Sequence, residues 1–512
     1  MTSCVPHLRT AGLLCAIALA CWPGAAAAQE PAPSLKLFAA DTSVRTTERA
    51  MRCCPALGLW ITATGGDFRI DLRRPGYGRW QATQVDARTG APLRSIPAGL
   101  IAGGRGLEDL VTLRYFDTRG RPVGRQTVTL CPGGFDVERV NDEGPPLPGL
   151  SAACSGGFPF TVGLVWGLSR GWAAPVRIEP GASISDIPRR VWRRLPRRLR
   201  ERLRRLARRQ APPVRLEPGA YRVVAEIGEQ HRRLFAIPPE DAAVTLRLRV
   251  VRAKRRGRPH HSASSARASA GSPLAAQAVE EPPASTRPDL AALPPWALRT
   301  SHRGRSGRDV LTFASSPWNA GPAPLVVEGF RRRGRAIMDA YQYFFDADGE
   351  VVGRAAAGAM AFHSAPRHNH WHFLQLVSYR LLRPDGRTAV RSRKQAFCIT
   401  ATDPVDLTLP RAEVNQGFPS IGGSSCGSPG SIWIREALPA GWADTYGAGI
   451  PGQSVDITRV PNGRYLMEMH VNPSGDLLEV TTENNIARRR LRLSGKPGRR
   501  RVHVAPWNGI RR

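Results

Sequence analysis

Three histidines occupy alternate positions in the segment RHNHWHF, at His368, His370 and His372. Because successive side chains on a β-strand point to opposite faces, a strand here would project all three imidazoles from one face. Neutral imidazoles grouped in this way suit copper(II) or zinc. A flat strand would hold the outer two about 13 Å apart at ~3.3 Å per residue, so binding one ion requires a curved or bulged strand. The alternative is a polar strand face without a metal, and His363 is a weaker candidate for a supporting group.

Two further reactive side chains follow in order, Lys394 in RKQAFC and Tyr446 in ADTYG. Each alone is an ordinary residue. Together with the three histidines, these segments resemble the catalytic domain of the lysyl oxidase family over Pro288 to Leu493, about 40% of the chain. The resemblance implies that the histidines bind copper. It also implies that Lys394 and Tyr446 are the catalytic residues and form the cofactor lysine tyrosylquinone.

Physical chemistry accounts for these residue types. Copper(II) with O₂ can oxidise a nearby tyrosine to a quinone, and a neutral lysine amine can add to that ring. Burial beside a metal lowers the pKa of a lysine, and only the neutral amine is a nucleophile. Lys394 and Tyr446 are 446 − 394 = 52 residues apart, so the fold must bring amine, phenol and metal together. We expect oxidative deamination of primary amines, peptidyl lysine included, to aldehydes, with consumption of O₂ and release of ammonia and hydrogen peroxide.

The C-terminal segments GQSVDITRVPNGRYLMEMHVNP and EVTTENN are also similar to that family. Family members bind calcium near this end, and the resemblance implies a calcium site here. Its ligands would be Asp289, Leu290, Glu479, Asn484 and Asn485. Thr481 stands where an aspartate is expected, which is a departure from the family pattern.

Two classes of function compete for this chain. One is an exported copper amine oxidase, and the other is a non-catalytic secreted metal-binding or adhesive protein. The presence of both Lys394 and Tyr446 favours the enzyme, because a binding module needs neither. A zinc hydrolase that uses the three histidines is a weaker third reading, since no HExxH motif accompanies them.

The chain has 512 residues, 42% of them apolar, and a formal net charge of +33 from 74 Lys plus Arg against 41 Asp plus Glu. This length and apolar content exclude a wholly disordered chain and allow several domains. Short alternating segments bounded by Gly and Pro predict a mainly β protein. We expect an antiparallel β-sandwich-like domain at 29–252, a flexible linker at 253–287, a β-rich lysyl-oxidase-like catalytic domain at 288–495 and a basic tail at 496–512.

One segment of the first domain breaks the β pattern. Residues 187–210 carry twelve arginines against the single Glu201, with Trp192 and four leucines at spacings of three and four. This predicts a basic amphipathic helix that could dock on an anionic envelope polymer or lipid surface. The alternative is a solvated insertion whose leucines pack on the sandwich. No aromatic stacking platform accompanies the charge, so we expect no nucleic-acid partner.

The first 28 residues have the pattern of a cleaved signal peptide, with Arg9, an apolar run and small residues up to Ala28. We therefore expect a secreted, periplasmic or cell-surface protein. Six cysteines remain after cleavage, and an even count in an oxidising compartment favours disulfides. Cys398 is expected to pair with Cys426. Three pairings are open to the other four: Cys53, Cys54, Cys131 and Cys154.

Overall fold

The computed structural model describes residues 32–53, 55–134, 136–150, 154, 157–178, 200–201, 214–252, 272–365, 368–392, 394, 396–415 and 423–510. Their backbone is mainly β, as predicted, and the strands pair antiparallel apart from one parallel pair. Burial alternates along strands such as Leu59–Thr64, because successive side chains face the interior and the solvent in turn. No helix in this part of the chain is long and apolar enough to cross a bilayer.

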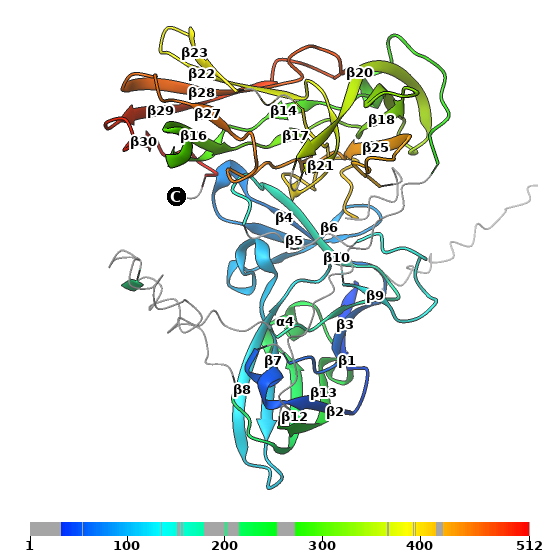
Figure 1. The fold of residues 1–512 in the computed structure, drawn as a ribbon. Helices are drawn as coiled ribbons and strands as arrows, with labels where there is room; N and C mark the ends of the chain where they lie inside the picture. Colours follow the sequence, from blue (N-terminus) through cyan, green and yellow to red (C-terminus); the bar gives the residue numbers. More distant parts are fainter. Residues whose placement is uncertain are drawn as a thin grey trace, which may run out of the picture. The chain divides into compact units, whose positions relative to one another are not determined.

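The N-terminal half, residues 32–252, contributes three of the sheets (Figure 1). The first has the order β1 (Ser34–Ala39), β3 (Leu59–Thr64), β11 (Trp172–Pro175) and β9 (Glu138–Arg139). The second has the order β10 (Gly163–Leu168), β4 (Phe68–Arg73), β5 (Gln81–Asp86) and β6 (Pro92–Ile96). The third has the order β2 (Ser43–Thr47), β13 (Ala243–Val251), β12 (Gly219–Ile227), β7 (Leu107–Phe116) and β8 (Pro122–Leu130), with β2 and β13 parallel.

Helices in the described residues are short. They are α1 (Glu48–Cys53), α4 (Glu229–Leu234) and α5 (Pro239–Ala242), with the 3-10 turns η1 (Pro75–Tyr77), η2 (Ala98–Leu100), η3 (Gly103–Arg105), η5 (Ala284–Thr286) and η6 (Gly304–Ser306). The predicted basic helix at 187–210 lies outside the described residues, apart from Arg200 and Glu201. The predicted signal peptide at 1–28 lies outside them too.

The predicted linker at 253–287 enters the described part of the chain at Ser272. From there the segment hydrogen-bonds to the C-terminal half. The backbone amide of Leu274 donates to Glu328, and Gln277 and Val279 exchange backbone hydrogen bonds with Arg354. Residues 272–287 therefore continue into the C-terminal half as packed chain.

The C-terminal half, residues 272–510, contributes four sheets. Two are small: β14 (Leu290–Ala292), β17 (Pro317–Asn319), β26 (Trp442–Ala443) and β24 (Asp403–Pro404) in one, and β15 (Trp296–Arg303), β16 (Arg308–Ala314) and β27 (Ser454–Asp456) in the other. The third has the order β21 (His368–Phe373), β20 (Val351–Ala365), β19 (Ile337–Phe345), β18 (Leu325–Arg331) and β25 (Trp433–Leu438). The fourth has the order β23 (Thr388–Arg391), β22 (Val377–Leu382), β28 (Gly463–Val471), β29 (Ile486–Ser494) and β30 (Arg501–Val504).

Hydrogen bonds join the residues just before β10 of the N-terminal half to the segment around β24. The amide of Val162 donates to the carbonyl of Val405 at 2.7 Å, and the Thr161 hydroxyl donates to the carbonyl of Pro404 at 2.8 Å. Residues 32–512 accordingly cluster as one compact unit. β24 in turn pairs with β26, the strand immediately before Asp444.

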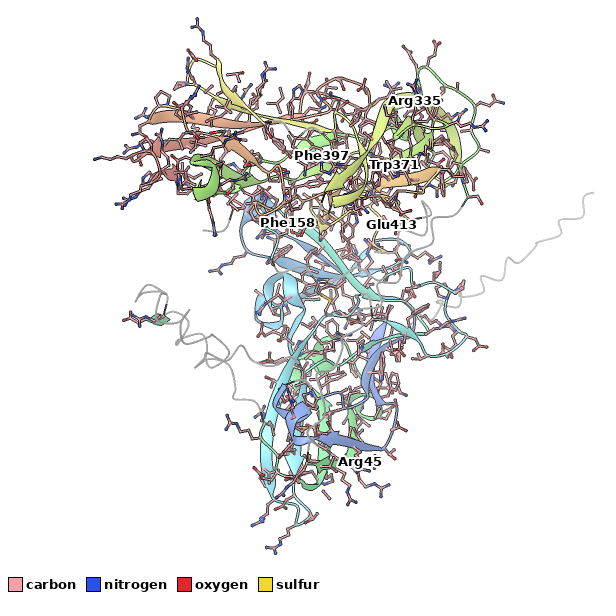
Figure 2. All side chains as sticks on the ribbon, in the orientation of Figure 1. Arg45, Phe158, Arg335, Trp371, Phe397 and Glu413 are labelled. Carbon is pink, nitrogen blue, oxygen red and sulfur yellow. A yellow bond between two sulfur atoms is a disulfide. The ribbon has the colours of Figure 1, made fainter. Side chains whose placement is uncertain are left out.

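Large aromatic side chains fill the interior of the C-terminal half. Trp371, Tyr379 and Phe397 are at most 1% exposed. Figure 2 shows Trp371 and Phe397 among the packed side chains of this half, whereas Arg335 is exposed. A buried pair, Arg435 and Glu328 at 2.7 Å, links β25 to β18 within the same sheet. Because Trp371 lies on β21 between His370 and His372, the strand that carries these histidines is anchored in this interior.

Candidate active site

Two neighbouring strands bring three histidines together. The register of β20 against β21 places His363 directly opposite His370, so both side chains lie on the same face. The Nε2 atoms of His370 and His372 are 2.9 Å apart, and the ring of His363 stacks on that of His372 at 5.3 Å between centroids. His372 is buried, and His370 is half-buried. His368 lies on β21, but its side chain is outside the described part of the molecule.

The chemistry of His370 and His372 suits a metal ion. Burial lowers the pKa of His370, and the positive charges of His363 and Lys394 lower it further. The neutral imidazole is the form that binds a metal. Two ring nitrogens that converge on one point could therefore both coordinate a copper ion.

Lys394 lies against Tyr446. Its Nζ atom is 4.5 Å from the centroid of the Tyr446 ring and 4.7 Å from that of Phe397. This nitrogen is buried and has no hydrogen-bond partner among the described residues. Burial lowers the pKa of Lys394 to about 8, although the charge of Asp444 acts in the opposite direction. The fold therefore brings these two residues together across 52 positions of sequence, and burial increases the neutral fraction of the amine near neutral pH.

Tyr446 is held in a fixed orientation. Its hydroxyl donates a hydrogen bond to the carbonyl of Cys398 at 2.6 Å, and its ring packs edge-on against Phe397 at 4.7 Å between centroids. Backbone hydrogen bonds with Ser315 fix its main chain on both sides. Burial raises the pKa of Tyr446 well above its usual range, and the Asp444 carboxyl raises it further. The phenol therefore stays protonated.

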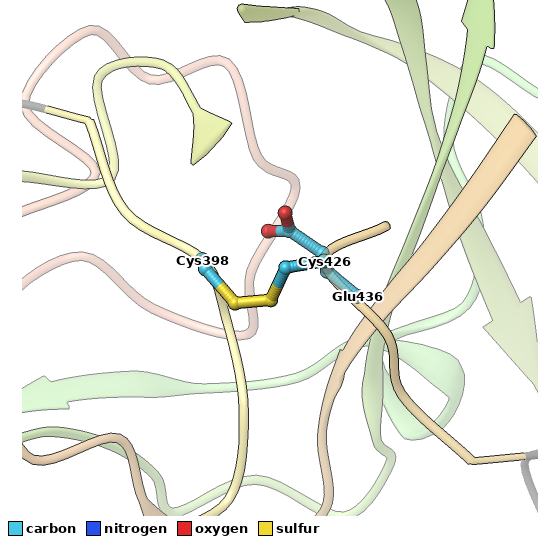
Figure 3. A group of neighbouring side chains, drawn as sticks. All are labelled: Cys398, Cys426 and Glu436. Carbon is cyan, nitrogen blue, oxygen red and sulfur yellow. A yellow bond between two sulfur atoms is a disulfide. The ribbon is translucent and has the colours of Figure 1, made fainter. Parts of the chain in front are cut away.

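A disulfide connects Cys398 to Cys426, as predicted from the sequence, and it lies beside Glu436 (Figure 3). The Glu436 carboxylate accepts a hydrogen bond from the amide of Ile399 at 2.8 Å, so the segment after Cys398 is tied to β25. Cysteine binds metals as a thiolate, so this bonded pair offers no metal site with Glu436. In the N-terminal half Cys131 pairs with Cys154. Cys54 and the side chain of Cys53 lie outside the described residues.

Two buried carboxyls next to Tyr446 were not among the residues predicted for the site. Asp444 and Glu436 are at most 1% exposed, and burial raises the pKa of each well above its usual range. Oδ2 of Asp444 and Oε1 of Glu436 have no hydrogen-bond partner in the described structure. The position of Asp444, two residues before Tyr446, was a signal that could have identified it. Glu436 lies in a hydrophobic strand with no motif around it.

Gly452 lies over the side chain of Lys394. It adopts φ +85°, and a Cβ atom built on it would lie 2.8 Å from Cδ and 3.0 Å from Cβ of Lys394. Both contacts involve the lower part of the lysine side chain, which cannot swing away as a free tip could. Only glycine therefore fits here without strain or displacement of the lysine.

The positions predicted for calcium lie together around Glu479. One Glu479 oxygen accepts from the amide of Leu290 at 2.7 Å, and the other accepts from Asn485 at 2.8 Å and from Asn472 at 2.6 Å. Asn484 donates to the Asp289 carboxylate at 3.0 Å. Burial raises the pKa of Glu479 to about 7. The Thr481 hydroxyl accepts a hydrogen bond from the backbone amide of Glu483 within the same turn.

Residues 349–503 match the family model described as Lysyl oxidase. The chain contains a lysyl oxidase domain. The matched segment includes the predicted copper ligands His368, His370 and His372, together with Lys394, Tyr446 and Glu479. Asp289 and Leu290 precede it.

Curated relatives agree with this assignment. The chain is 28% identical to lysyl oxidase homolog 2 of Gallus gallus over 130 residues, which are 25% of this chain and 15% of that protein. It is 28% identical to homolog 4 of Mus musculus over 170 residues, 33% of this chain and 20% of the relative. It is 30% identical to homolog 1 of Homo sapiens over 131 residues, 25% of this chain and 20% of the relative. The matched region thus spans at most a fifth of the length of these relatives.

Proposed function

We propose that this protein is a copper-dependent amine oxidase that uses lysine tyrosylquinone formed from Lys394 and Tyr446. It deaminates primary amines, peptidyl lysine among them, to aldehydes and releases ammonia and hydrogen peroxide. The observation that supports this most directly is the buried Lys394 amine, 4.5 Å from the Tyr446 ring. A protein that only bound metal or adhered to a surface would have no use for this arrangement.

Bound copper with O₂ would oxidise the Tyr446 ring, and the resulting quinone would accept electrons from the substrate amine. His370 and His372 would hold the metal, with His368 as the third ligand. Lys394 supplies a nucleophilic nitrogen because burial lowers its pKa to about 8. Gly452 leaves the space that the lysine side chain occupies beside the ring.

Asp444 is the group that would move protons. Its carboxyl interacts with the Tyr446 hydroxyl and with the charge of Lys394, and its Oδ2 atom has no hydrogen-bond partner among the described residues. A carboxyl whose pKa is raised by burial takes up a proton more readily than an exposed one and can return it. We assign Asp444 this role, with Glu436 as a neighbouring buried acid that holds the Ile399 segment.

The remaining expectations complete the proposal. Calcium would bind at Asp289, Leu290, Glu479, Asn484 and Asn485, where the carbonyl oxygens of both asparagine side chains have no hydrogen-bond partner in the described structure. The two disulfides suit an oxidising compartment, which agrees with export through a signal peptide at 1–28. The sandwich-like domain at 29–252 and its basic segment at 187–210 would direct the enzyme to an anionic envelope or lipid surface.

The deciding experiment is performed on the copper-loaded, aerated protein. We expect visible quinone absorbance, labelling by phenylhydrazine, and a cross-linked peptide that joins Lys394 to Tyr446 in mass spectrometry. Lys394→Ala and Tyr446→Phe should each keep copper and lose all three signals, whereas the control Tyr341→Phe should keep them. Bound metal without any quinone in the wild-type protein would overturn the proposal in favour of a non-catalytic metal-binding or adhesive protein.

A further inference from the structure

The outward face of the last sheet carries a row of basic side chains. The register places Arg464 of β28 directly opposite Arg492 of β29, and Arg492 directly opposite His503 of β30. Directly opposite residues project from the same face, so these three lie side by side across three strands. Arg490 is two residues before Arg492 on the same face. All four side chains are exposed.

This row has no acidic counterpart in the described part of the chain. Arg464, Arg490 and Arg492 form no ion pair there. Glu468, four residues after Arg464 on β28, is 1% exposed and already binds Arg488, at 2.8 Å, and Arg380. Like charges directly opposite each other on a sheet destabilise it. The sheet therefore holds its arginines against their mutual repulsion.

A groove of about 670 Å³ lies among these side chains. Its lining includes all four basic residues together with apolar Pro384 and Leu466, and it contains no Asp or Glu. This volume falls within the ~300–1,000 Å³ typical of ligand sites. Arg490 and Arg492 are about 7 Å apart along the strand, and neighbouring strands are about 5 Å apart. Positive charges thus recur at short, regular distances along a surface that also has apolar contacts.

We infer that this groove, lined by Arg464, Arg490, Arg492 and His503, binds an acidic glycan. Guanidinium groups donate paired hydrogen bonds to carboxylate or sulfate groups, and the C–H faces of sugar rings can pack on Pro384 and Leu466. A single-stranded nucleic acid would be held by aromatic rings on which its bases stack. The aromatic residue in the lining, Tyr465, is 6% exposed, and its hydroxyl is bonded to the carbonyl of Pro461. The inference is independent of the proposed amine oxidation.

The test uses the full chain and defined short ligands. Calorimetric titration compares tetragalacturonate, a sulfated tetrasaccharide and neutral maltotetraose, with tetraglutamate as an acidic ligand without sugar rings. The variant is Arg490→Gln with Arg492→Gln. Its control is Arg247→Gln with Arg249→Gln, which removes the same charge from alternate exposed positions of β13. Hydrogen–deuterium exchange then locates the bound ligand on the chain.

We expect an acidic tetrasaccharide to bind the wild-type and control proteins and to protect 463–466 and 488–505 from exchange. The Arg490→Gln, Arg492→Gln protein should bind about 100-fold more weakly, because each of the two substitutions removes a charge-assisted hydrogen bond worth about tenfold in affinity. Binding by either acidic sugar supports the inference, and the tighter one identifies the acid group.

Three results would overturn it. The first is an equal loss of affinity for the acidic sugars in the control variant. The second is binding of tetraglutamate as tight as that of the acidic sugars. The third is absence of binding by both acidic sugars.

Discussion

Two buried polar clusters in the C-terminal half differ in which of their polar atoms have hydrogen-bond partners. Around Glu479 both carboxylate oxygens accept hydrogen bonds, and the atoms left over are the side-chain carbonyl oxygens of Asn484 and Asn485. Around Tyr446 the atoms left over are the Lys394 amine and one oxygen each of Asp444 and Glu436. One cluster satisfies both oxygens of its central carboxylate, and the other leaves an amine and one oxygen of each of two carboxyls without a hydrogen-bond partner among the described residues.

The difference separates a structural role from a chemical one. An unpaired buried polar group costs about 1–3 kcal/mol, so folded proteins rarely keep several together without a use for them. The Tyr446 cluster concentrates such groups where the Lys394 amine lies 4.5 Å from the centroid of the Tyr446 ring. The Glu479 cluster instead joins β14 to the turn before β29 and presents oxygen atoms, the ligands that calcium prefers. Mutations in the two clusters should therefore affect different measurements.

The largest expected effect is the loss of activity in Tyr446→Phe. Without the phenol oxygen no quinone forms, and the rate of hydrogen peroxide release from a primary amine should fall at least about 10⁶-fold, to the uncatalysed background. The free energy of unfolding should fall by only about 1 kcal/mol, for the hydrogen bond to Cys398. Tyr341→Phe is the matched control and should keep full activity. Residual turnover above a few per cent would assign the chemistry to another residue.

Glu479→Ala should have the largest effect on stability. It leaves the Leu290 amide and the side chains of Asn472 and Asn485 without their acceptor, and we expect a loss of about 3–5 kcal/mol. Urea denaturation of the metal-free protein measures this change. Glu479→Gln keeps one acceptor and should lose less. A cost below about 1 kcal/mol for the alanine variant would show that the cluster does not support the fold.

Lys394→Met should shift stability in the opposite direction. Methionine fills a similar volume and buries no charge, so at pH 7 we expect a gain of about 1–2 kcal/mol, together with complete loss of quinone formation. The same urea titration checks the sign. Lys36→Met is the control, because Lys36 is exposed and its ion pair with Asp241 is worth little. Destabilisation by Lys394→Met would remove the contrast between the clusters.

The smallest effect concerns His231, a buried group outside both clusters. Its Nε2 atom has no hydrogen-bond partner among the described residues, and burial lowers its pKa below 6.5. Between the folded pKa and 6.5 the unfolded chain binds the extra proton, so stability decreases as pH falls below about 6.5. The slope is at most about 1.4 kcal/mol per pH unit. Thermal melts of wild type and His231→Phe at pH 5 to 7 should diverge on the acid side, and parallel curves would contradict this.

Local patterns in the sequence were sufficient for the parts of the site that are close along the chain. Alternation within RHNHWHF placed His370 and His372 on one face, and the C-terminal half has two cysteines, which left one pairing. The alternation of apolar and polar residues along each strand is also a local pattern, and it predicted the mainly β fold. The family resemblance added Lys394 and Tyr446, whose proximity depends on long-range packing that no local pattern reveals.

The parts that the sequence did not reveal depend on tertiary register. His363 lies opposite His370 because β20 and β21 pair at one specific offset, and a shift of one residue would turn the ring to the other face. Glu436 reaches Ile399 across 37 positions of sequence, and nothing in either segment signals the other. Both contacts join segments that are not neighbours in local structure, so they follow from the whole fold and not from a local pattern.

Gly452 offers a criterion for deciding which related sequences could form the proposed cofactor. A side chain at the position of Gly452 would collide with Lys394. A related chain with a larger residue there should therefore not form the proposed cross-link, even where the histidines, the lysine and the tyrosine are all present. A single glycine, far from the histidines in sequence, thus becomes a marker for the proposed cofactor.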